Sequence, residues 1–299
     1  GGVVAEFGGL YTSHIRDEGT YTVGLVAAVN EVIEIAEAND LRGIVSHMKA
    51  LGPDSWGLSV AATTRLDEAR RRGVEVYADQ YPYEASSTGL SAALVPRWAQ
   101  VGGADALKRR LADPETRTAI VGEMQENLSR RGGAETIVVA FYRSDPLLEG
   151  QTLAKIAETR GRPAVETALE LIARGRVSII SFNMSEHDIA HIMQQPYTMT
   201  SSDGGLVSMG DGQPHPRNYG AFARKLARYV REREVVPLEF AVRSMTSLPA
   251  SVFRLRDRGV LRVGAWADVV IFDPATVWDR ATYSDPHQLA EGIDTVIVN

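Results

Sequence analysis

The sequence lacks cysteine altogether and carries no excess of basic residues. With no cysteine among its 299 residues, disulfide bonds, thiolate metal ligands and a cysteine nucleophile are excluded within this chain. The formal net charge is -6, whereas a surface that binds phosphate groups usually has a basic excess. We therefore expect no nucleic-acid partner.

Long apolar runs are missing as well. No stretch approaches the roughly 18 consecutive apolar residues that a membrane span needs, and no signal-peptide pattern opens the chain. We expect no membrane partner and a cytoplasmic location. The first residue is Gly1 rather than methionine, and the chain closes at Val298 and Asn299 within an apolar run. Both ends are therefore expected to be cuts through a longer protein.

Strand and helix patterns alternate over the first 80 residues. The composition is that of an ordinary globular protein, 44% hydrophobic and 23% charged. Short strands are predicted at 10–13, 43–46 and 74–78, with helical periodicity of apolar residues between them. This alternation, at a spacing of about 30 residues, predicts βα units and a parallel sheet.

The regular alternation of strand and helix patterns ends at about residue 85. Residues 85–195 are predicted to be mostly helical, with strands at 137–141 and 177–182 among the helices. Another strand is predicted at 197–202, followed by helices at 219–233 and 237–247. The tail has two strand-like stretches, 268–273 and 295–298.

Three predicted strands end in a residue that can bind a metal: His14, His47 and Asp203. In a (β/α)8 barrel the active site lies at the carboxyl ends of the strands, so its ligands come from separate strands. His14 and His47 are 33 residues apart, about one βα repeat, which would place their imidazoles side by side on adjacent strands. Imidazole and carboxylate groups suit zinc. The alternative at each histidine is a hydrogen-bonded structural residue, and Asp203 in its glycine turn also fits plain turn chemistry.

His187 and His191 form a second histidine pair, spaced i and i+4 on a predicted helix. This is the spacing of a helical zinc pair, but the metalloprotease pattern would put glutamate at position 188, where the chain has Asp188. We interpret this pair as a partly exposed helix face. A capping pattern at Ser185 and Asp188 predicts the start of that helix.

Several of these segments resemble the N-acyl-D-amino-acid deacylases, or D-aminoacylases, of the amidohydrolase superfamily. The resemblance covers nearly the whole chain. The residues that carry it are 11–19 (YTSHIRDEG), 46–49 (SHMK), 79–83 (DQYPY) with 86–88 (SST), 202–204 (SDG), 215–220 (HPRNYG) and 267–273 (ADVVIFD).

The resemblance implies a fold and an organisation. The fold would be an α/β, (β/α)8 TIM-type amidohydrolase barrel, with its C-terminal strands present and its first strands absent, plus part of a small β domain. Residues 1–255 would form the partial barrel, with a helical insertion at about 85–195. Residues 256–299 would return into a small β-sandwich domain.

The resemblance also implies roles for individual residues. His14, His47 and Asp203 would bind zinc, as one or two ions, and Asp203 would act as general base and then as acid. Arg217 would pair with the α-carboxylate of an N-acyl-D-amino acid, since a guanidinium suits a carboxylate. The remaining pocket residues would be Lys49, Tyr83, Ser86, Ser87 and His215.

Two features of the family are absent from the sequence. No two histidines are two residues apart, so the first-strand His-x-His pair is missing, and the bridging cysteine of the best-known members is missing too. Two rival interpretations therefore stay open. One is an amidohydrolase that opens a cyclic amide or imide, and the other is a truncated, non-catalytic scaffold of the same fold.

Overall fold

Four parallel strands form the central sheet, in the order β1-β2-β3-β7. The computed structural model describes all 299 residues. The strands lie within a few residues of the predicted ones, which confirms the βα units and the parallel sheet. Because the order in space follows the order in the chain, β1 and β7 are the two edges of an open sheet. The strands are β1 (Leu10–Ser13), β2 (Arg42–Val45), β3 (Val76–Gln80) and β7 (Thr198–Thr200).

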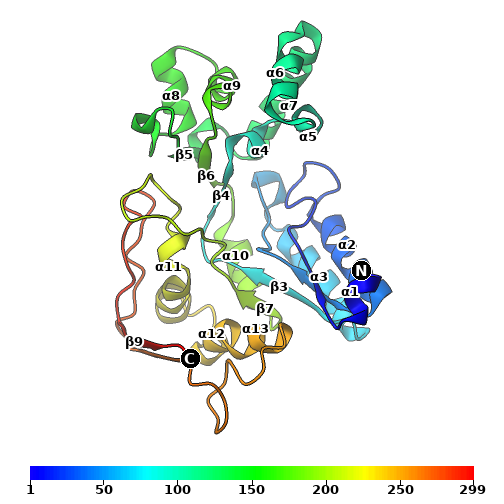
Figure 1. Cartoon of the computed structure of the whole chain (residues 1–299), viewed down its shortest axis with the longest axis vertical. Coiled ribbons are helices and arrows are strands. Elements are labelled where there is room, and N and C mark those ends of the chain that lie inside the picture. The colour runs from blue at the N-terminus through cyan, green and yellow to red at the C-terminus, as the bar shows by residue number, and fades with distance from the viewer.

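Helices α2 (Leu25–Asn39) and α3 (Leu58–Arg71) connect the first three strands and pack beside the sheet (Figure 1). The buried residues of α2 recur every three or four positions, so one face of the helix is apolar. That face joins the buried residues of α3 and of the strands in one core cluster of 18 residues. α10 (Glu186–Met193) packs against α3. Short helices α1 (Gly2–Glu6) and η1 (Pro53–Ser55) complete this part.

Residues between β3 and β7 form a separate lobe, which we call the insertion lobe and define as residues 85–182. Figure 1 shows it standing above the parallel sheet. Its strands form an antiparallel sheet in the order β4-β6-β5. The elements are β4 (Ala85–Gly89), α4 (Leu90–Leu94), α5 (Arg97–Gln100), α6 (Gly103–Ala112), α7 (Pro114–Arg130), η2 (Ala134–Thr136), β5 (Ile137–Phe141), η3 (Pro146–Leu148), α8 (Leu153–Arg160), α9 (Ala164–Arg174) and β6 (Ser178–Phe182).

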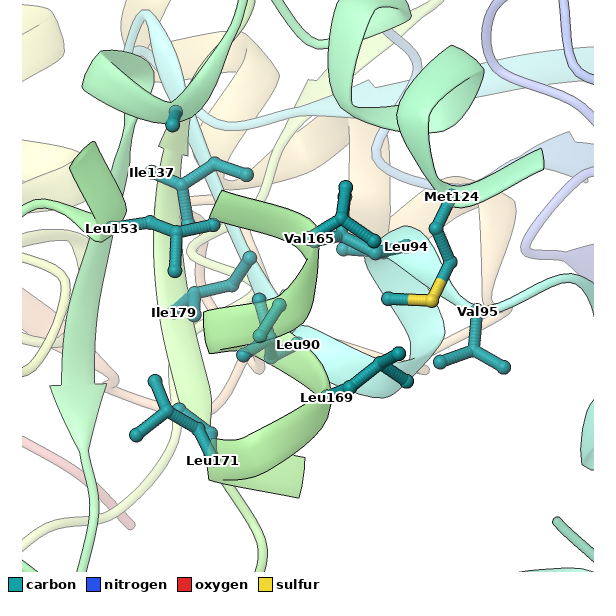
Figure 2. Packing of buried hydrophobic residues seen from close by; sticks show 14 of the residues in the cluster. Leu90, Leu94, Val95, Met124, Ile137, Leu153, Val165, Leu169, Leu171 and Ile179 are labelled. Atoms are coloured by element: carbon teal, nitrogen blue, oxygen red, sulfur yellow. The ribbon is translucent and has the colours of Figure 1, made fainter. Parts of the chain in front are cut away.

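The insertion lobe has its own apolar core of 20 buried residues. Figure 2 shows Leu90, Ile137, Leu153 and Ile179 from different elements packing together in it. The insertion is mostly helical, as predicted, and the strands predicted at 137–141 and 177–182 are confirmed as β5 and β6, whereas β4 was not predicted. β4 escaped prediction because its sequence, ASSTG, has no alternation of apolar and polar residues.

The last third of the chain is mostly helical and packs against β7 through one of its helices. It contains α11 (Arg217–Arg224), which continues as the π-helical η4 (Lys225–Glu232), then α12 (Leu238–Met245) and α13 (Ser247–Val252). The predicted tail strands are confirmed as an antiparallel pair, β8 (Val269–Phe272) and β9 (Ile293–Ile297). The return of residues 256–299 into a small β-sandwich domain stays a prediction. None of the helices combines the length and the apolar character needed to cross a bilayer.

Candidate metal centre and cavity

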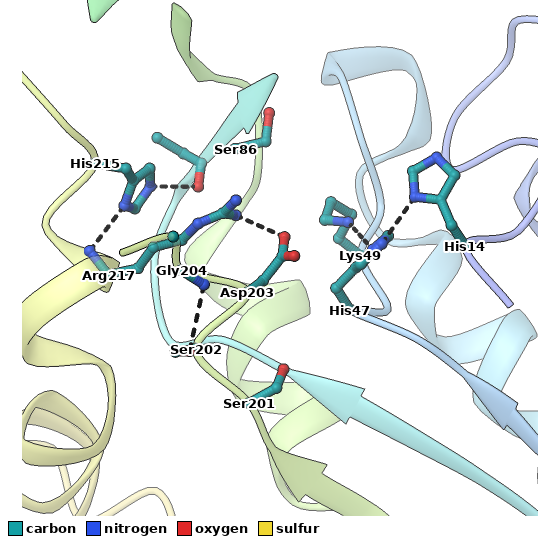
Figure 3. Close-up of polar contacts among 12 residues, drawn as sticks. His14, His47, Lys49, Ser86, Ser201, Ser202, Asp203, Gly204, His215 and Arg217 are labelled. Atoms are coloured by element: carbon teal, nitrogen blue, oxygen red, sulfur yellow. Dashed lines mark hydrogen bonds and ion pairs between the residues drawn. The ribbon is translucent and has the colours of Figure 1, made fainter. Parts of the chain in front are cut away.

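His14 and His47 follow two neighbouring strands and face each other. β1 pairs with β2 in parallel register, with Ser13 opposite Val45, so the residues that follow the two strands leave the sheet together. Nδ1 of His14 lies 2.8 Å from Nε2 of His47, and Figure 3 shows the two rings next to each other. The predicted side-by-side placement of the imidazoles is confirmed.

The other ring nitrogen of His47, Nδ1, lies within hydrogen-bonding distance of Glu18 and Lys49. Nδ1 of His47 lies 2.8 Å from Oε1 of Glu18 and 2.7 Å from Nζ of Lys49. Lys49 and Glu18 are themselves 2.5 Å apart. Burial alone would raise the pKa of Glu18, but Lys49 and His47 outweigh burial and lower it to about 2. Burial opposes the charge of Lys49 in turn, yet Glu18 raises the pKa of the lysine.

Two groups of opposite character lie beside Nδ1 of His47. The ionised carboxylate of Glu18 can only accept a hydrogen bond and the ammonium of Lys49 can only donate one, so Nδ1 can donate to Glu18 or accept from Lys49. With the proton on Nδ1, Nε2 presents its lone pair toward His14. Burial lowers the pKa of His14, and the charges of His47 and Lys49 act in the same direction, although Glu18 opposes them. A carboxylate behind a histidine is the usual support of a metal-binding imidazole.

The donor set fits a zinc ion. His14, Glu18 and His47 form a group whose ligand atoms all lie within 4.8 Å of one another. Two nitrogens bound to one tetrahedral zinc are about 3.3 Å apart, given Zn–N bonds of about 2.0 Å. The observed 2.8 Å separation therefore needs only a small opening. Asp203, the third predicted ligand, is not in this group but faces the same cavity.

Asp79, at the end of β3, accepts hydrogen bonds from residues that follow β2 and β7. Its Oδ1 accepts the backbone N–H of His47 at 2.9 Å and the hydroxyl of Ser201 at 2.6 Å. Oδ2 accepts the hydroxyl of Ser46 at 3.1 Å. The backbone at His47 has φ +40°, a region that non-glycine residues seldom adopt. One carboxylate thus fixes the strained turn that presents His47 and the segment that leads to Asp203.

Asp203 and Arg217 form an ion pair on the opposite wall. Nη1 of Arg217 lies 2.9 Å from Oδ2 of Asp203, and the Asp203 side chain is 37% exposed. In Figure 3 Asp203 lies between Arg217 and the two histidines. The contact is not aligned as a hydrogen bond, and the buried Nε of Arg217 has no acceptor. The guanidinium therefore keeps donors available for a bound carboxylate.

His215 supports Arg217 from behind. It donates from Nε2 to the carbonyl of Ala85 at 2.9 Å, while its Nδ1 accepts the backbone N–H of Arg217 at 3.0 Å. Burial, and then the charge of Arg217, lowers the pKa of His215 well below its usual value, so the ring is neutral. Tyr81 covers the guanidinium of Arg217 at 4.5 Å, and Tyr83 packs edge-on against His215.

These residues surround a cavity of about 570 Å³ between the parallel sheet and the insertion lobe. Most of the predicted site residues line it: His14, His47, Lys49, Ser86, Ser87, Asp203 and Arg217. Tyr83 and His215 do not; they are buried behind the wall, with exposed fractions of 1% and 2%. Their predicted contact with substrate stays a prediction, and the structure gives them a packing role.

The second histidine pair lies elsewhere. His187 is exposed on α10, and Nε2 of His191 is 2.8 Å from the hydroxyl of Thr63. The Ser185 hydroxyl accepts the N–H of Asp188, which confirms the predicted helix start, while the buried Asp188 carboxylate holds the backbone of Gly57. The interpretation of this pair as a helix face agrees with these contacts.

Sequence reasoning missed Glu18, Asp79 and Arg131 as parts of this site. Glu18 is four residues after His14, and Asp79 ends a strand as His14 and His47 do, so both had a positional signal. Arg131 lies at the end of α7 and gave no signal, because only the fold of the insertion lobe brings it to the cavity.

Comparison with known proteins places this chain in a family. The model of the amidohydrolase family matches residues 12–299. An N-acyl-D-glutamate deacylase of Alcaligenes xylosoxydans xylosoxydans is 39% identical, over 99% of this chain and 52% of that protein. A D-aminoacylase of the same organism is 35% identical, over 98% of this chain and 51% of that protein.

A solved structure gives the same result. The crystal structure of N-acyl-D-glutamate deacylase from Bordetella bronchiseptica, complexed with zinc and a phosphonate inhibitor, has a TM-score of 0.79 and 38% identity. The match covers 99% of this chain and 53% of that one, so this chain spans about half the length of the relatives it matches. With the family model matching nearly every residue, this chain belongs to the amidohydrolase family and has its TIM-barrel-type α/β fold.

Proposed function

We propose that the protein hydrolyses the amide bond of N-acyl-D-amino acids with the help of zinc, releasing a carboxylate and a D-amino acid. The observation that carries the proposal is the pair of facing imidazoles, His14 and His47, across one cavity from the Asp203–Arg217 ion pair. The names of the similar proteins, N-acyl-D-glutamate deacylase and D-aminoacylase, point to the same reaction.

His14 and His47 would hold the metal through the ring nitrogens that face each other. The chemistry that zinc supplies when bound is polarisation of the amide carbonyl and a lower pKa for a water molecule. By accepting a hydrogen bond from a proton-bearing Nδ1, Glu18 would favour the tautomer of His47 that has a free lone pair on Nε2. Asp203 would complete the metal site, and whether it holds one or two ions stays a prediction.

Asp203 would move the proton of the reaction. Its partly exposed carboxylate faces the cavity, so it can take a proton from water and later give it to the amide nitrogen. The α-carboxylate of the substrate would displace Asp203 from Arg217, because a guanidinium binds a carboxylate with two parallel hydrogen bonds. Substrate binding would thus release the general base from its ion pair.

Other cavity residues would orient the substrate. Lys49, Ser86 and Ser87 line the cavity and offer donors to a carboxylate or an amide. His215 and Tyr83 would act from behind by fixing Arg217 and the wall around it.

We further propose that β1, β2, β3 and β7 are consecutive strands of an eight-stranded barrel, and that β8 and β9 belong to its small β domain. The cytoplasmic location stays a prediction.

Zinc binding and D-selective hydrolysis, measured together, test the function. The chain is stripped of metal, titrated with zinc, and assayed with N-acetyl-D- and N-acetyl-L-amino acids and with a cyclic imide. His14→Asn should lose zinc, whereas His187→Asn, a change at an exposed histidine, should keep it. Zinc with D-selective cleavage supports the proposal. Zinc with cleavage of only the imide indicates a different amidohydrolase reaction, and neither zinc nor activity indicates a non-catalytic scaffold.

A further inference from the structure

The cavity continues from the two histidines to the inner wall of the insertion lobe, where Arg131 lies. Arg131 follows the last turn of α7 and is among the residues that line the cavity. It is only 6% exposed. Tyr21, from the loop after His14, lies against it, with the Arg131 guanidinium carbon 5.9 Å from the ring centre.

Arg131 has no acidic partner. Its Nε and Nη1 donate long hydrogen bonds to the carbonyl of Ala93 at 3.4 Å and to the hydroxyl of Ser181 at 3.3 Å. The Asn183 amide oxygen, when turned toward Arg131, is 3.0 Å from Nη1. All of these groups are neutral, and Nη2 donates to no atom of the chain.

The other buried cations of the cavity are neutralised. Lys49 is paired with Glu18, and Arg217 is paired with Asp203. Arg130, next to Arg131 in sequence, is paired with Glu126 on its own helix. Arg131 alone among these combines deep burial with an uncompensated charge, and a buried charge without a partner is costly. The Tyr21 hydroxyl beside it is likewise buried without a hydrogen bond.

We propose that Arg131 and Tyr21 form a subsite for the side-chain carboxylate of an acidic D-amino acid, so that the preferred substrates are of the N-acyl-D-glutamate class. The free Nη2 and the Tyr21 hydroxyl supply donors, and the guanidinium supplies the charge that a carboxylate needs. Arg217 would hold the α-carboxylate while Arg131 holds the second one. The identity of the substrate class rests on the proposed function, whereas the carboxylate subsite can be tested without turnover.

Binding of reaction products separates the subsite from the chemistry. Calorimetry with D-glutamate and D-glutamine compares a charged side chain with a neutral one of the same shape. We expect the unaltered chain to bind D-glutamate at least tenfold more tightly. Arg131→Met should weaken D-glutamate binding about 10- to 100-fold and leave D-glutamine nearly unchanged, because one charged hydrogen-bonding group is lost. The affinity of Arg131→Lys for D-glutamate should lie between those of the unaltered chain and Arg131→Met.

Arg130→Met is the matched control, since it removes a neighbouring arginine whose charge is already compensated. It should preserve the preference for D-glutamate. Equal losses for both ligands in Arg131→Met, or equal binding of both by the unaltered chain, would show that Arg131 only supports the lobe and would overturn the subsite. Binding of neither ligand would overturn it too.

Hydrolysis of the corresponding N-acetyl compounds then distinguishes the two proposals. Cleavage of N-acetyl-D-glutamine and N-acetyl-D-glutamate at equal kcat/KM retains the deacylase function and rejects the subsite. Selective binding of D-glutamate without cleavage of any N-acetyl-D-amino acid retains the subsite and rejects the function.

Discussion

At the carboxyl edge of the parallel sheet several charged or polar side chains are buried, whereas the insertion lobe encloses an apolar core. Asp17, Lys49 and His215 are each no more than 5% exposed near the sheet edge. In the lobe, Leu90, Ile137 and the other members of the main cluster are all apolar. The two sides of the cavity therefore differ in what they contribute. The edge of the sheet positions the reactive groups, and the insertion lobe forms a wall that is stabilised by apolar packing.

The strongest effect on activity should come from the sheet edge. Asp203→Asn removes the proton carrier and the negative charge beside Arg217 but keeps the shape of the side chain. We expect kcat to fall about 10²- to 10⁴-fold, while His14 and His47 still hold zinc. Kinetics on the zinc-loaded protein, with metal analysis of the same sample, measures this. Near-normal turnover would remove Asp203 from the mechanism.

The strongest effect on stability should come from the lobe. Leu153 is fully buried in the lobe core, and Leu153→Ala should lower the free energy of unfolding by about 2–5 kcal/mol. Zinc affinity should stay close to normal, because His14 and His47 belong to the other region. Leu147→Ala, at a position that is 85% exposed, is the control and should change stability by less than about 0.5 kcal/mol. A loss of zinc affinity equal to that of a site variant would mean that the two regions are one cooperative unit.

A third prediction concerns a polar group buried beneath β7. Lys225 is 2% exposed, and its only hydrogen bonds, each 2.8 Å long, are to the hydroxyls of Thr200 and Ser244. Burial lowers the pKa of Lys225 to about 7, from 10.5. Between these pH values the unfolded chain binds more protons than the folded one, so this group makes stability rise with pH from about 7 to about 10.5.

Lys225→Met should therefore stabilise the protein by about 1–4 kcal/mol at neutral pH, with a smaller gain at pH 10. Urea unfolding at several pH values measures both the gain and its slope. The same pH dependence in the variant and in the unaltered protein would show that other groups control it.

The smallest expected change in stability is at Asp79. This residue tests whether the edge of the parallel sheet affects zinc binding more than stability. Asp79→Ala removes the acceptor shared by His47 and Ser201. We expect a stability loss of about 1–3 kcal/mol and a zinc affinity about 10- to 100-fold lower. Titration with zinc and thermal unfolding test this, and Ser46→Ala, which removes one of the three contacts, should show a fraction of both effects. Unchanged zinc binding in Asp79→Ala would mean that the turn at His47 is held by other contacts.

Much of the sheet and part of the site could be predicted from the sequence. Strands of parallel sheets end at one edge, so the 33-residue spacing of His14 and His47 was enough to place them side by side. β4 could not be predicted, because its pairing with β6 involves residues far apart in the chain and its own sequence has no strand pattern. Arg131 could not be assigned for a related reason: its contacts with Ala93 and Ser181 span 38 and 50 residues.

The strand order described above has one more consequence. β1 and β7 each have a neighbouring strand on one side only, so each is an edge of the sheet. All four strands run in the same direction, and a strand that added to either edge in parallel would bring its last residue to the rim of the cavity. The side chains at the carboxyl end of such a strand would face the same cavity as those that follow β1, β2, β3 and β7.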